Sequence, residues 1–129
     1  MPKRILIADD EPDAVQLLEF YLQRAGFELA VATDGEQAVQ LARETPPDLI
    51  VLDLLLPKLD GFEVCKALRG EPRTARVPVL MLTAFSSAEA CETGLELGAD
   101  DYLVKASSPR EIVARINKLL ERGTTSVVA

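Results

Sequence analysis

Apolar runs and amphipathic stretches alternate five times along the chain. The runs at residues 5–8 and 49–52 contain only apolar side chains, which is typical of strands buried on both faces. Each run is followed by a stretch in which apolar residues recur every three or four positions, the period of a helix with one buried face. This alternation predicts a parallel sheet covered by helices on both faces.

Capping residues, glycines and prolines place the boundaries of these elements. We predict strands at residues 5–8, 27–33, 49–52, 77–82 and 101–104. We predict helices at about residues 12–25, 35–43, 62–69, 87–97 and 109–122, with the fourth beginning at Ser86 or Ser87. The wholly apolar strand at 49–52 is expected at the centre of the sheet, and the mixed strand at 27–33 nearer an edge. Residues 1–122 are expected to form one domain, and residues 123–129 a flexible tail or the start of a linker.

The composition is that of a single acidic domain. The chain has 129 residues, with 14 Lys and Arg against 21 Asp and Glu, which gives a net charge of −7. Because this charge repels phosphate backbones, we expect no direct binding of nucleic acid. The sequence has no apolar run near the roughly 18 residues that span a bilayer and no signal-peptide pattern. We therefore expect a soluble, cytoplasmic protein that does not bind a membrane.

The rarer chemical side chains exclude several classes of enzyme. The chain has no histidine, which removes the catalytic triads of hydrolases and the commonest transition-metal ligand. Cys65 and Cys91 lie in separate segments without the CxxC spacing of a zinc site or a disulfide framework. We expect both to be buried free thiols.

Polar residues stand at the ends of the predicted strands. Because right-handed crossovers bring the carboxyl ends of parallel strands to one edge of the sheet, these residues should lie close together. They are Asp9, Asp10, Asp53, Thr83 and Lys105. Acids in a first helical turn stabilise the helix, which explains Glu11 and Asp13 but not Asp53. A phosphate-binding loop would need glycines after the first strand, where this chain has acids.

The acids at this edge require positive partners. Two carboxylates about 4 Å apart repel by roughly 4 kcal/mol at an effective dielectric constant of 20. Lys105 supplies one positive charge, and a hard divalent cation with oxygen ligands supplies another. We therefore predict Mg²⁺ at Asp10 and Asp53, with Asp9 bound directly or through water.

Recognisable motifs surround these strand ends. Asp9-Asp10 follows the first strand, residues 49–57 read LIVLDLLLP and precede Asp60-Gly61, residues 82–84 read LTA, and residues 98–105 read GADDYLVK. From Lys3 to about Arg122 the chain resembles the receiver domain of two-component response regulators. This resemblance implies a flavodoxin-like, doubly wound (βα)5 fold with a five-stranded parallel sheet in the order 2-1-3-4-5.

The resemblance also implies a phosphorylation switch. The family's phosphoacceptor matches Asp53, which attacks the phosphoryl group carried by a sensor histidine kinase or a phosphotransfer protein. The family's Mg²⁺ ligands match Asp9, Asp10 and Asp53, together with the backbone carbonyl of Leu55. The residues matching Thr83 and Lys105 contact phosphoryl oxygens.

The resemblance implies that an aromatic side chain transmits the change at the site to the protein surface. The residue matching Tyr102 turns inward behind Thr83 and alters the face formed by the fourth helix, the fifth strand and the fifth helix. A downstream protein or an output domain would bind this face. The domain would assist its own phosphorylation without turning over an external substrate, as a monomer or a phosphorylation-promoted dimer.

Two features depart from the family pattern. Ala106 follows Lys105 where the family usually has a proline in a cis peptide, and a cis bond before a non-proline residue costs about 2.5–4 kcal/mol, so trans is favoured. In the branch of DNA-binding regulators that dimerise through the last helices, the fourth helix usually carries basic residues, and here residues 91–93 are Cys, Glu and Thr. Asp101 and Arg115 could still pair across an interface.

Three alternative functions remain open at this stage. The fold could serve as a phosphorylation-independent protein-binding module. A magnesium phosphatase of the dehalogenase type also uses a strand-end aspartyl phosphate, but it has a second aspartate two residues later, where this chain has Leu55. A flavin or nucleotide binder of flavodoxin type is disfavoured by the acidic first loop.

Overall fold

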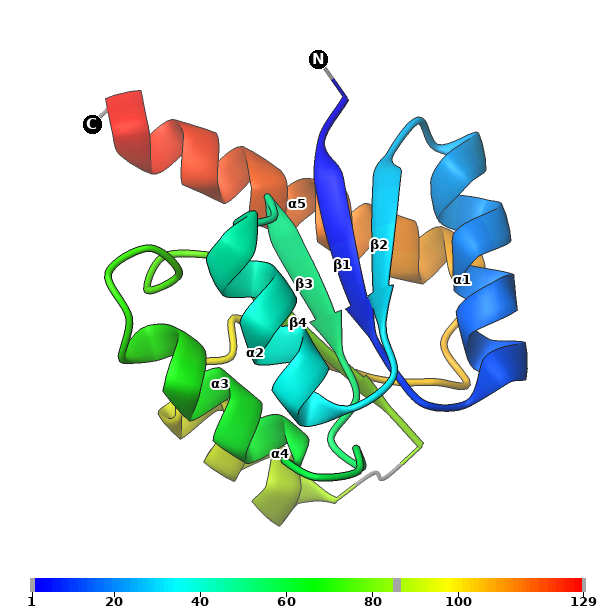
Figure 1. Cartoon of the computed structure of the whole chain (residues 1–129). Coiled ribbons are helices and arrows are strands. Elements are labelled where there is room, and N and C mark those ends of the chain that lie inside the picture. Colours follow the sequence, from blue (N-terminus) through cyan, green and yellow to red (C-terminus); the bar gives the residue numbers. More distant parts are fainter. Residues whose placement is uncertain (1, 85–86, 129) are drawn as a thin grey trace.

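A computed structural model describes residues 2–84 and 87–128, with side chains up to Arg122. Strands and helices alternate along the whole chain (Figure 1). The strands are β1 (Arg4–Ala8), β2 (Glu28–Ala32), β3 (Leu49–Leu52), β4 (Val79–Thr83) and β5 (Asp101–Val104). The helices are α1 (Pro12–Arg24), α2 (Gly35–Glu44), α3 (Gly61–Arg69), α4 (Ala88–Glu96) and α5 (Pro109–Val128).

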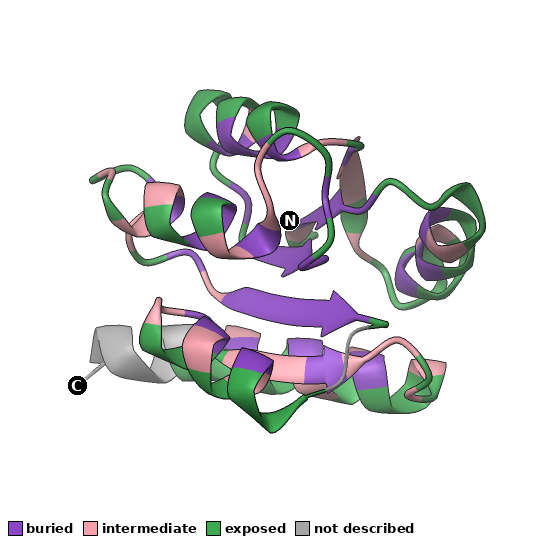
Figure 2. Ribbon diagram, turned by 90° about the horizontal axis from the view of Figure 1, so that it is seen from below, coloured by how far each residue is buried: buried purple, intermediate pink, exposed green. Residues whose placement is uncertain are grey.

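The strands form one parallel sheet in the order β2-β1-β3-β4-β5. This order confirms the predicted doubly wound fold, with the apolar β3 at the centre and the mixed β2 at an edge. Every residue of β3 and β4 is buried, because helices cover both faces of these strands (Figure 2). Alternate side chains along each strand therefore enter different cores.

Two hydrophobic cores lie on the two faces of the sheet. Ile5, Ile7 and Val51 pack in one core with the buried sides of α1 and α5. Leu6 and Ile50 pack in the other core with α2 and α3. α1 and α5 therefore cover one face of the sheet and α2 and α3 the other, and the carboxyl ends of the strands stay free to carry polar residues.

Several element ends differ from the sequence-based prediction. β4 begins at Val79 because the Val77 amide closes a turn onto the carbonyl of Thr74. α4 has Ser87 as its N-cap, and Ser86 lies outside the described residues. α5 continues to Val128, past the predicted end near residue 122, since a glycine inside a helix costs only about 1 kcal/mol relative to alanine. The assignment of residues 123–129 to a linker stays a prediction.

The two cysteines differ in their surroundings. Cys65 is a buried free thiol on α3, as predicted, and its Sγ lies 3.5 Å from the carbonyl oxygen of Leu97. Burial raises the pKa of the Cys65 thiol. Cys91 is a free thiol but only half-buried on α4, so the prediction of full burial was wrong for this residue. The spacing of apolar residues predicted that Cys91 lies on the inward face of α4. It did not show that this face is only partly buried at Cys91.

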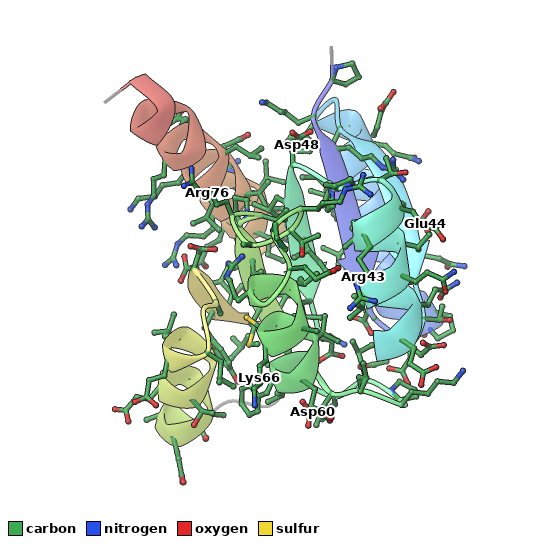
Figure 3. The ribbon with its side chains drawn as sticks, turned by 60° about the vertical axis from the view of Figure 1, so that its left-hand side comes forward. Arg43, Glu44, Asp48, Asp60, Lys66 and Arg76 are labelled. Atoms are coloured by element: carbon green, nitrogen blue, oxygen red, sulfur yellow. The ribbon has the colours of Figure 1, made fainter. Side chains whose placement is uncertain are left out.

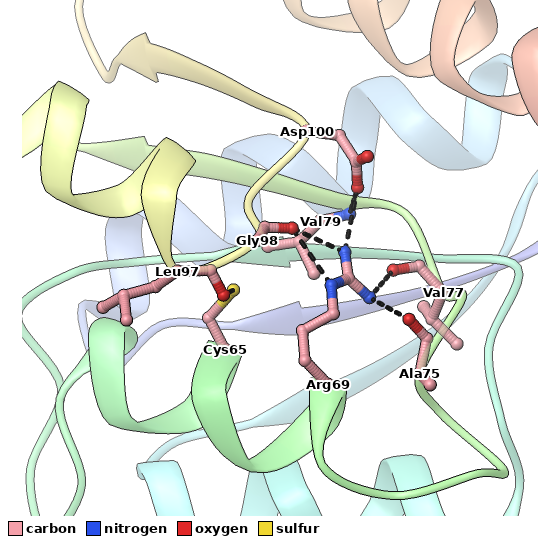
Figure 4. Close-up of polar contacts among 8 residues, drawn as sticks. All are labelled: Cys65, Arg69, Ala75, Val77, Val79, Leu97, Gly98 and Asp100. Carbon is pink, nitrogen blue, oxygen red and sulfur yellow. Dashed lines mark hydrogen bonds and ion pairs between the residues drawn. The ribbon is translucent and has the colours of Figure 1, made fainter.

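Arg69, the last residue of α3, bonds to residues 75–77 and 98–100 at the edge of the sheet where β4 and β5 begin (Figure 4). Its guanidinium donates to the carbonyl oxygens of Ala75, Val77 and Gly98 at 2.7–3.0 Å and pairs with Asp100 at 3.0 Å. Gly98 has φ +110°, and a Cβ there would lie 2.9 Å from the Arg69 side chain. The turn between α4 and β5 is therefore built around this arginine.

We predict that Arg69→Met lowers the free energy of unfolding by about 2–3 kcal/mol. The reason is that several backbone carbonyls lose a charged donor at once. Urea unfolding followed by circular dichroism measures this change. Arg73→Met is the matched control, because Arg73 is an exposed arginine in the segment that follows α3, and its effect should stay within about 0.5 kcal/mol. Equal stabilities of the two variants would contradict the structural role of Arg69.

Candidate phosphoacceptor site

The polar strand ends meet at one edge of the sheet. Asp9 follows β1 and Asp53 follows β3, and their amides donate to the carbonyl oxygens of Ala32 and Ala8 at 3.0 and 2.9 Å. Lys105 follows β5, and its amide donates to the carbonyl of Thr83 at 2.9 Å. These backbone bonds extend the sheet by one residue beyond the strands, and they hold the functional side chains on its rigid frame.

Lys105 lies at the centre of the site. Its Nζ is 2.9 Å from Asp9 Oδ2, 2.9 Å from Asp53 Oδ2 and 2.6 Å from Glu11 Oε1. The side chains of Asp9 and Asp53 are only 4% exposed, whereas that of Glu11 is 61% exposed. One ammonium group therefore compensates two buried carboxylates and one carboxylate at the rim.

These contacts shift the pKa values of the two buried partners. Burial alone lowers the pKa of Lys105, but hydrogen bonds to Glu11, Asp9 and Asp53 outweigh it and raise the pKa above its usual 10.5. Burial raises the pKa of Asp9 above 3.8, and the Glu11 amide and Lys105 offset this only in part. Ionisation of Asp9 is therefore less favourable in the folded site than in the unfolded chain.

We predict that Asp9→Asn raises the Tm at neutral pH in a buffer with a metal chelator. Since the folded protein holds the Asp9 proton more tightly than the unfolded chain does, this group's contribution to stability falls as pH rises from 3.8 through the folded pKa. Asparagine is uncharged at both neutral and acidic pH, whereas Asp9 becomes protonated and uncharged in acid. The gain in Tm from Asp9→Asn should therefore vanish below pH 3.8. Thermal unfolding at neutral and acidic pH measures the difference. A lower Tm than wild type at neutral pH would contradict the burial argument.

Oxygen ligands suitable for a divalent cation gather beside Lys105. One carboxylate oxygen from each of Asp9, Asp10 and Asp53 lies within 4.8 Å of the others. Asp10 is exposed, so the cluster opens to solvent on one side. Three anionic oxygens around an open position match the preference of Mg²⁺ for hard ligands and retained waters. The donor set therefore fits the predicted metal.

The loop between β3 and α3 is held closely against its neighbours. The amide of Leu55 donates to Asp53 Oδ1 at 3.2 Å, which places Leu55 directly beside the acid. A Cβ at Gly61 would lie 2.6 Å from the carbonyl oxygen of Asp53, so only glycine fits there. Asp60, labelled in Figure 3, forms a capping box with Glu63 that begins α3 at this point. The backbone around Asp53 and Leu55 is thus fixed from both ends.

Thr83 lies on β4 and Tyr102 on β5, the two strands that follow β3 in the sheet. Thr83 is the last residue of β4 and is fully buried. Tyr102 is half-buried on β5 and packs against the core formed with α2 and α3. Burial raises the pKa of Tyr102, and the charges of Cys91 and Asp53 add to this effect.

Glu11 is the functional contact that the sequence analysis missed. It occupies the N-cap position of α1, but its side chain makes no capping hydrogen bond and instead reaches Lys105. The prediction of a capping role for the Glu11 carboxylate was therefore wrong, while Asp13 does lie in the first turn as expected. Glu11 directly precedes Pro12, the first residue of α1. The local sequence does not show whether an acid at such a position caps the helix or pairs with a lysine far away in the chain.

The two departures from the family pattern have structural outcomes. The described residues contain no cis peptide bond, so the bond between Lys105 and Ala106 is trans, as favoured. Arg115 pairs with Asp101 of the same chain at 2.6 Å and lies 3.8 Å from Glu111. These two neighbours already compensate the charge of Arg115 within one copy of the chain.

Comparison with known proteins decides the family. A family model described as the response regulator receiver domain matches residues 5–117. The chain belongs to the response regulator receiver family. This membership confirms the resemblance seen at the strand ends.

Curated relatives of this receiver domain are transcriptional regulators. The chain is 51% identical over 122 residues to the alkaline phosphatase synthesis transcriptional regulatory protein PhoP of Bacillus subtilis, covering 95% of this chain and 50% of that protein. It is 48% identical over 119 residues to the DNA-binding dual master transcriptional regulator RpaA of Synechocystis, covering 92% and 49%. The receiver domain therefore spans about half the length of these relatives.

Solved structures give the same family and fold. The receiver domain of Francisella response regulator 1452 is 36% identical with a TM-score of 0.87, covering 94% of this chain and 98% of that one. The BeF3-activated N-terminal receiver domain of Klebsiella pneumoniae RstA is 32% identical with a TM-score of 0.85, covering 91% and 97%. Among the described residues of the present domain, no helix is both long and apolar enough to cross a bilayer.

Proposed function

We propose that this receiver domain accepts a phosphoryl group on Asp53 in a Mg²⁺-dependent reaction and acts as a phosphorylation-controlled switch. The observation that carries the proposal is the contact set of Asp53. Its Oδ2 lies 2.9 Å from Lys105 Nζ, and its carboxylate belongs to the cluster with Asp9 and Asp10. A buried carboxylate, a cation and two further acids thus meet at one point.

The proposed transfer uses Asp53 as the nucleophile. A carboxylate oxygen of Asp53 forms a bond to phosphorus while the phosphorus–nitrogen bond of the donor phosphohistidine breaks, and the departing imidazole nitrogen keeps the electron pair. Lys105 donates to the transferred oxygens, where negative charge is concentrated. Asp9, Asp10, Asp53 and the Leu55 carbonyl would hold Mg²⁺, which would supply further neutralisation of this charge when bound. The product is an aspartyl phosphate on the domain itself, and the domain is not a turnover enzyme.

The proposed output runs through Thr83 and Tyr102. The Thr83 hydroxyl would hydrogen-bond a phosphoryl oxygen at the end of β4. Tyr102 would then turn inward, which changes the surface formed by α4, β5 and α5. The buried residues of α4 are the small Ala90 and Gly94. Because these residues bury little side-chain surface, a shift of α4 over the sheet would break few apolar contacts. A downstream protein or an output domain would recognise the altered surface.

The partners follow from family membership. Receiver domains of two-component systems interact with sensor kinases, so a sensor histidine kinase or a phosphotransfer protein is the proposed donor. Because these relatives are transcriptional regulators of about twice this length, and one of them is described as DNA-binding, we propose that control of transcription is the output. With a net charge of −7, the receiver domain itself is not the proposed DNA-binding part.

The experiment that tests this function is intact-mass spectrometry after incubation with acetyl phosphate. We expect one added phosphoryl group with Mg²⁺ and none when a chelator replaces Mg²⁺. A receiver domain of known activity, treated in parallel, controls for the donor. No added mass at any time point while the control is phosphorylated would contradict the proposal, and it would favour a phosphorylation-independent binding module.

A further inference from the structure

Lys105 has no spare hydrogen-bond donor in this structure. An ammonium group has three N–H bonds and no acceptor. The Nζ of Lys105 lies within 3 Å of three carboxylates, from Asp9, Glu11 and Asp53. A phosphoryl group arriving on Asp53 therefore finds its main cationic partner fully occupied. One of the three existing contacts has to be given up.

Exposure decides which contact is released. Asp9 and Asp53 are 4% exposed, so either carboxylate would gain little water on leaving Lys105 and would depend on the proposed Mg²⁺ alone for its positive partner. Glu11 is 61% exposed and gains full hydration when it leaves Lys105. Its side chain also caps no helix amide, so its movement leaves α1 unchanged. Glu11 is the partner that can be displaced at the lowest cost.

We propose that Glu11 is a regulatory positioning residue that occupies Lys105 in the resting domain and is displaced when a phosphoryl group binds. The contact between Glu11 and Lys105 stabilises the unphosphorylated state, because an incoming phosphoryl group has to compete with Glu11 for the same N–H donor. This inference rests on the proposed function of Asp53 as phosphoacceptor. It adds a residue whose role is to weaken the resting affinity of the site for the phosphoryl group.

Removing Glu11 should tighten binding of a phosphoryl analogue. The probe is beryllofluoride with Mg²⁺, and ¹⁹F NMR measures the bound fraction without any phosphoryl transfer. Since exposed ion pairs are weak, we expect Glu11→Ala to lower the apparent Kd by about two- to fivefold. Acetyl phosphate labelling should accelerate by a similar factor. Asp13→Ala is the matched control, because it removes an exposed carboxylate from the same end of α1, and the described ion pairs of Lys105 are with Asp9, Glu11 and Asp53 instead.

The outcomes separate this inference from the function on which it rests. Wild-type binding with a selective gain in Glu11→Ala supports the displacement. Wild-type binding with equal gains in Glu11→Ala and Asp13→Ala shows a general charge effect and overturns it. Absence of beryllofluoride binding and of labelling in the wild type contradicts the proposed function, and the inference falls with it.

A second measurement keeps the inference testable if the variants fold poorly. A crystal structure of the wild-type domain with beryllofluoride and Mg²⁺ should show Lys105 bonded to the analogue and Glu11 beyond hydrogen-bond distance from Nζ. A retained contact between Glu11 and Lys105 in that complex would overturn the proposal.

Discussion

Asp53→Asn will abolish phosphorylation by acetyl phosphate and leave the fold intact. The amide nitrogen and oxygen of asparagine are poor nucleophiles, so no phosphoryl bond forms at this position. Asparagine has the shape of aspartate, and its side-chain oxygen still accepts the hydrogen bond from the Leu55 amide. We therefore expect a fully folded protein with no mass gain. Intact mass measures the labelling, and circular dichroism checks the fold.

The matched control for this variant is Asp13→Asn. It removes a carboxylate from the same edge of the sheet, but Asp13 is exposed in the first turn of α1. Asp13→Asn should be labelled as fully as the wild type. A full phosphoryl gain in Asp53→Asn would place the acceptor elsewhere and refute the site assignment.

Lys105→Ala will slow phosphorylation without abolishing it. Asp53 and the carboxylates proposed to bind Mg²⁺ stay in place, but the proposed donor to the transferred oxygens is lost. Removing one such donor typically costs on the order of 10²-fold in rate. The variant should also lose about 1–3 kcal/mol of stability without metal, because Asp9 and Asp53 remain buried without their cation. Labelling time courses and urea unfolding measure the two effects.

Lys58→Ala is the control for the loss of a lysine. Lys58 lies on the loop between β3 and α3, but it is exposed and reaches its acidic neighbours Asp34 and Glu36 only at 3.7 and 4.0 Å. Its removal should change neither the labelling rate nor the stability by a measurable amount. Equal labelling rates for Lys105→Ala and wild type would show that the lysine does not act on the phosphoryl group.

The sheet and the strand-end residues were predictable because their signals are local or topological. A wholly apolar run such as Leu49–Leu52 can only be buried on both faces, which places it at the centre of the sheet. Right-handed crossovers then bring the residue after each strand to the same edge. The positions of Asp9, Asp53 and Lys105 follow from these two rules alone.

The remaining features depend on where long side chains reach in three dimensions. Glu11 could cap α1 or bind Lys105, and only the position of β5 next to β4 decides between these roles. Arg69 and Gly98 lie far apart in the sequence, so their contact has no local pattern. Arg115 and Asp101 lie 14 residues apart, and their contact within one chain depends on how α5 packs beside β5.

Locating the phosphoryl group on Asp53 is the most direct test of the account. After labelling with acetyl phosphate and Mg²⁺, borohydride reduces an aspartyl phosphate to the alcohol of homoserine, and peptide mass spectrometry finds the converted residue. We predict homoserine at position 53 and at no other acid. Conversion of Asp9, Asp10 or Asp60, or labelled protein in which Asp53 stays aspartate, would contradict it.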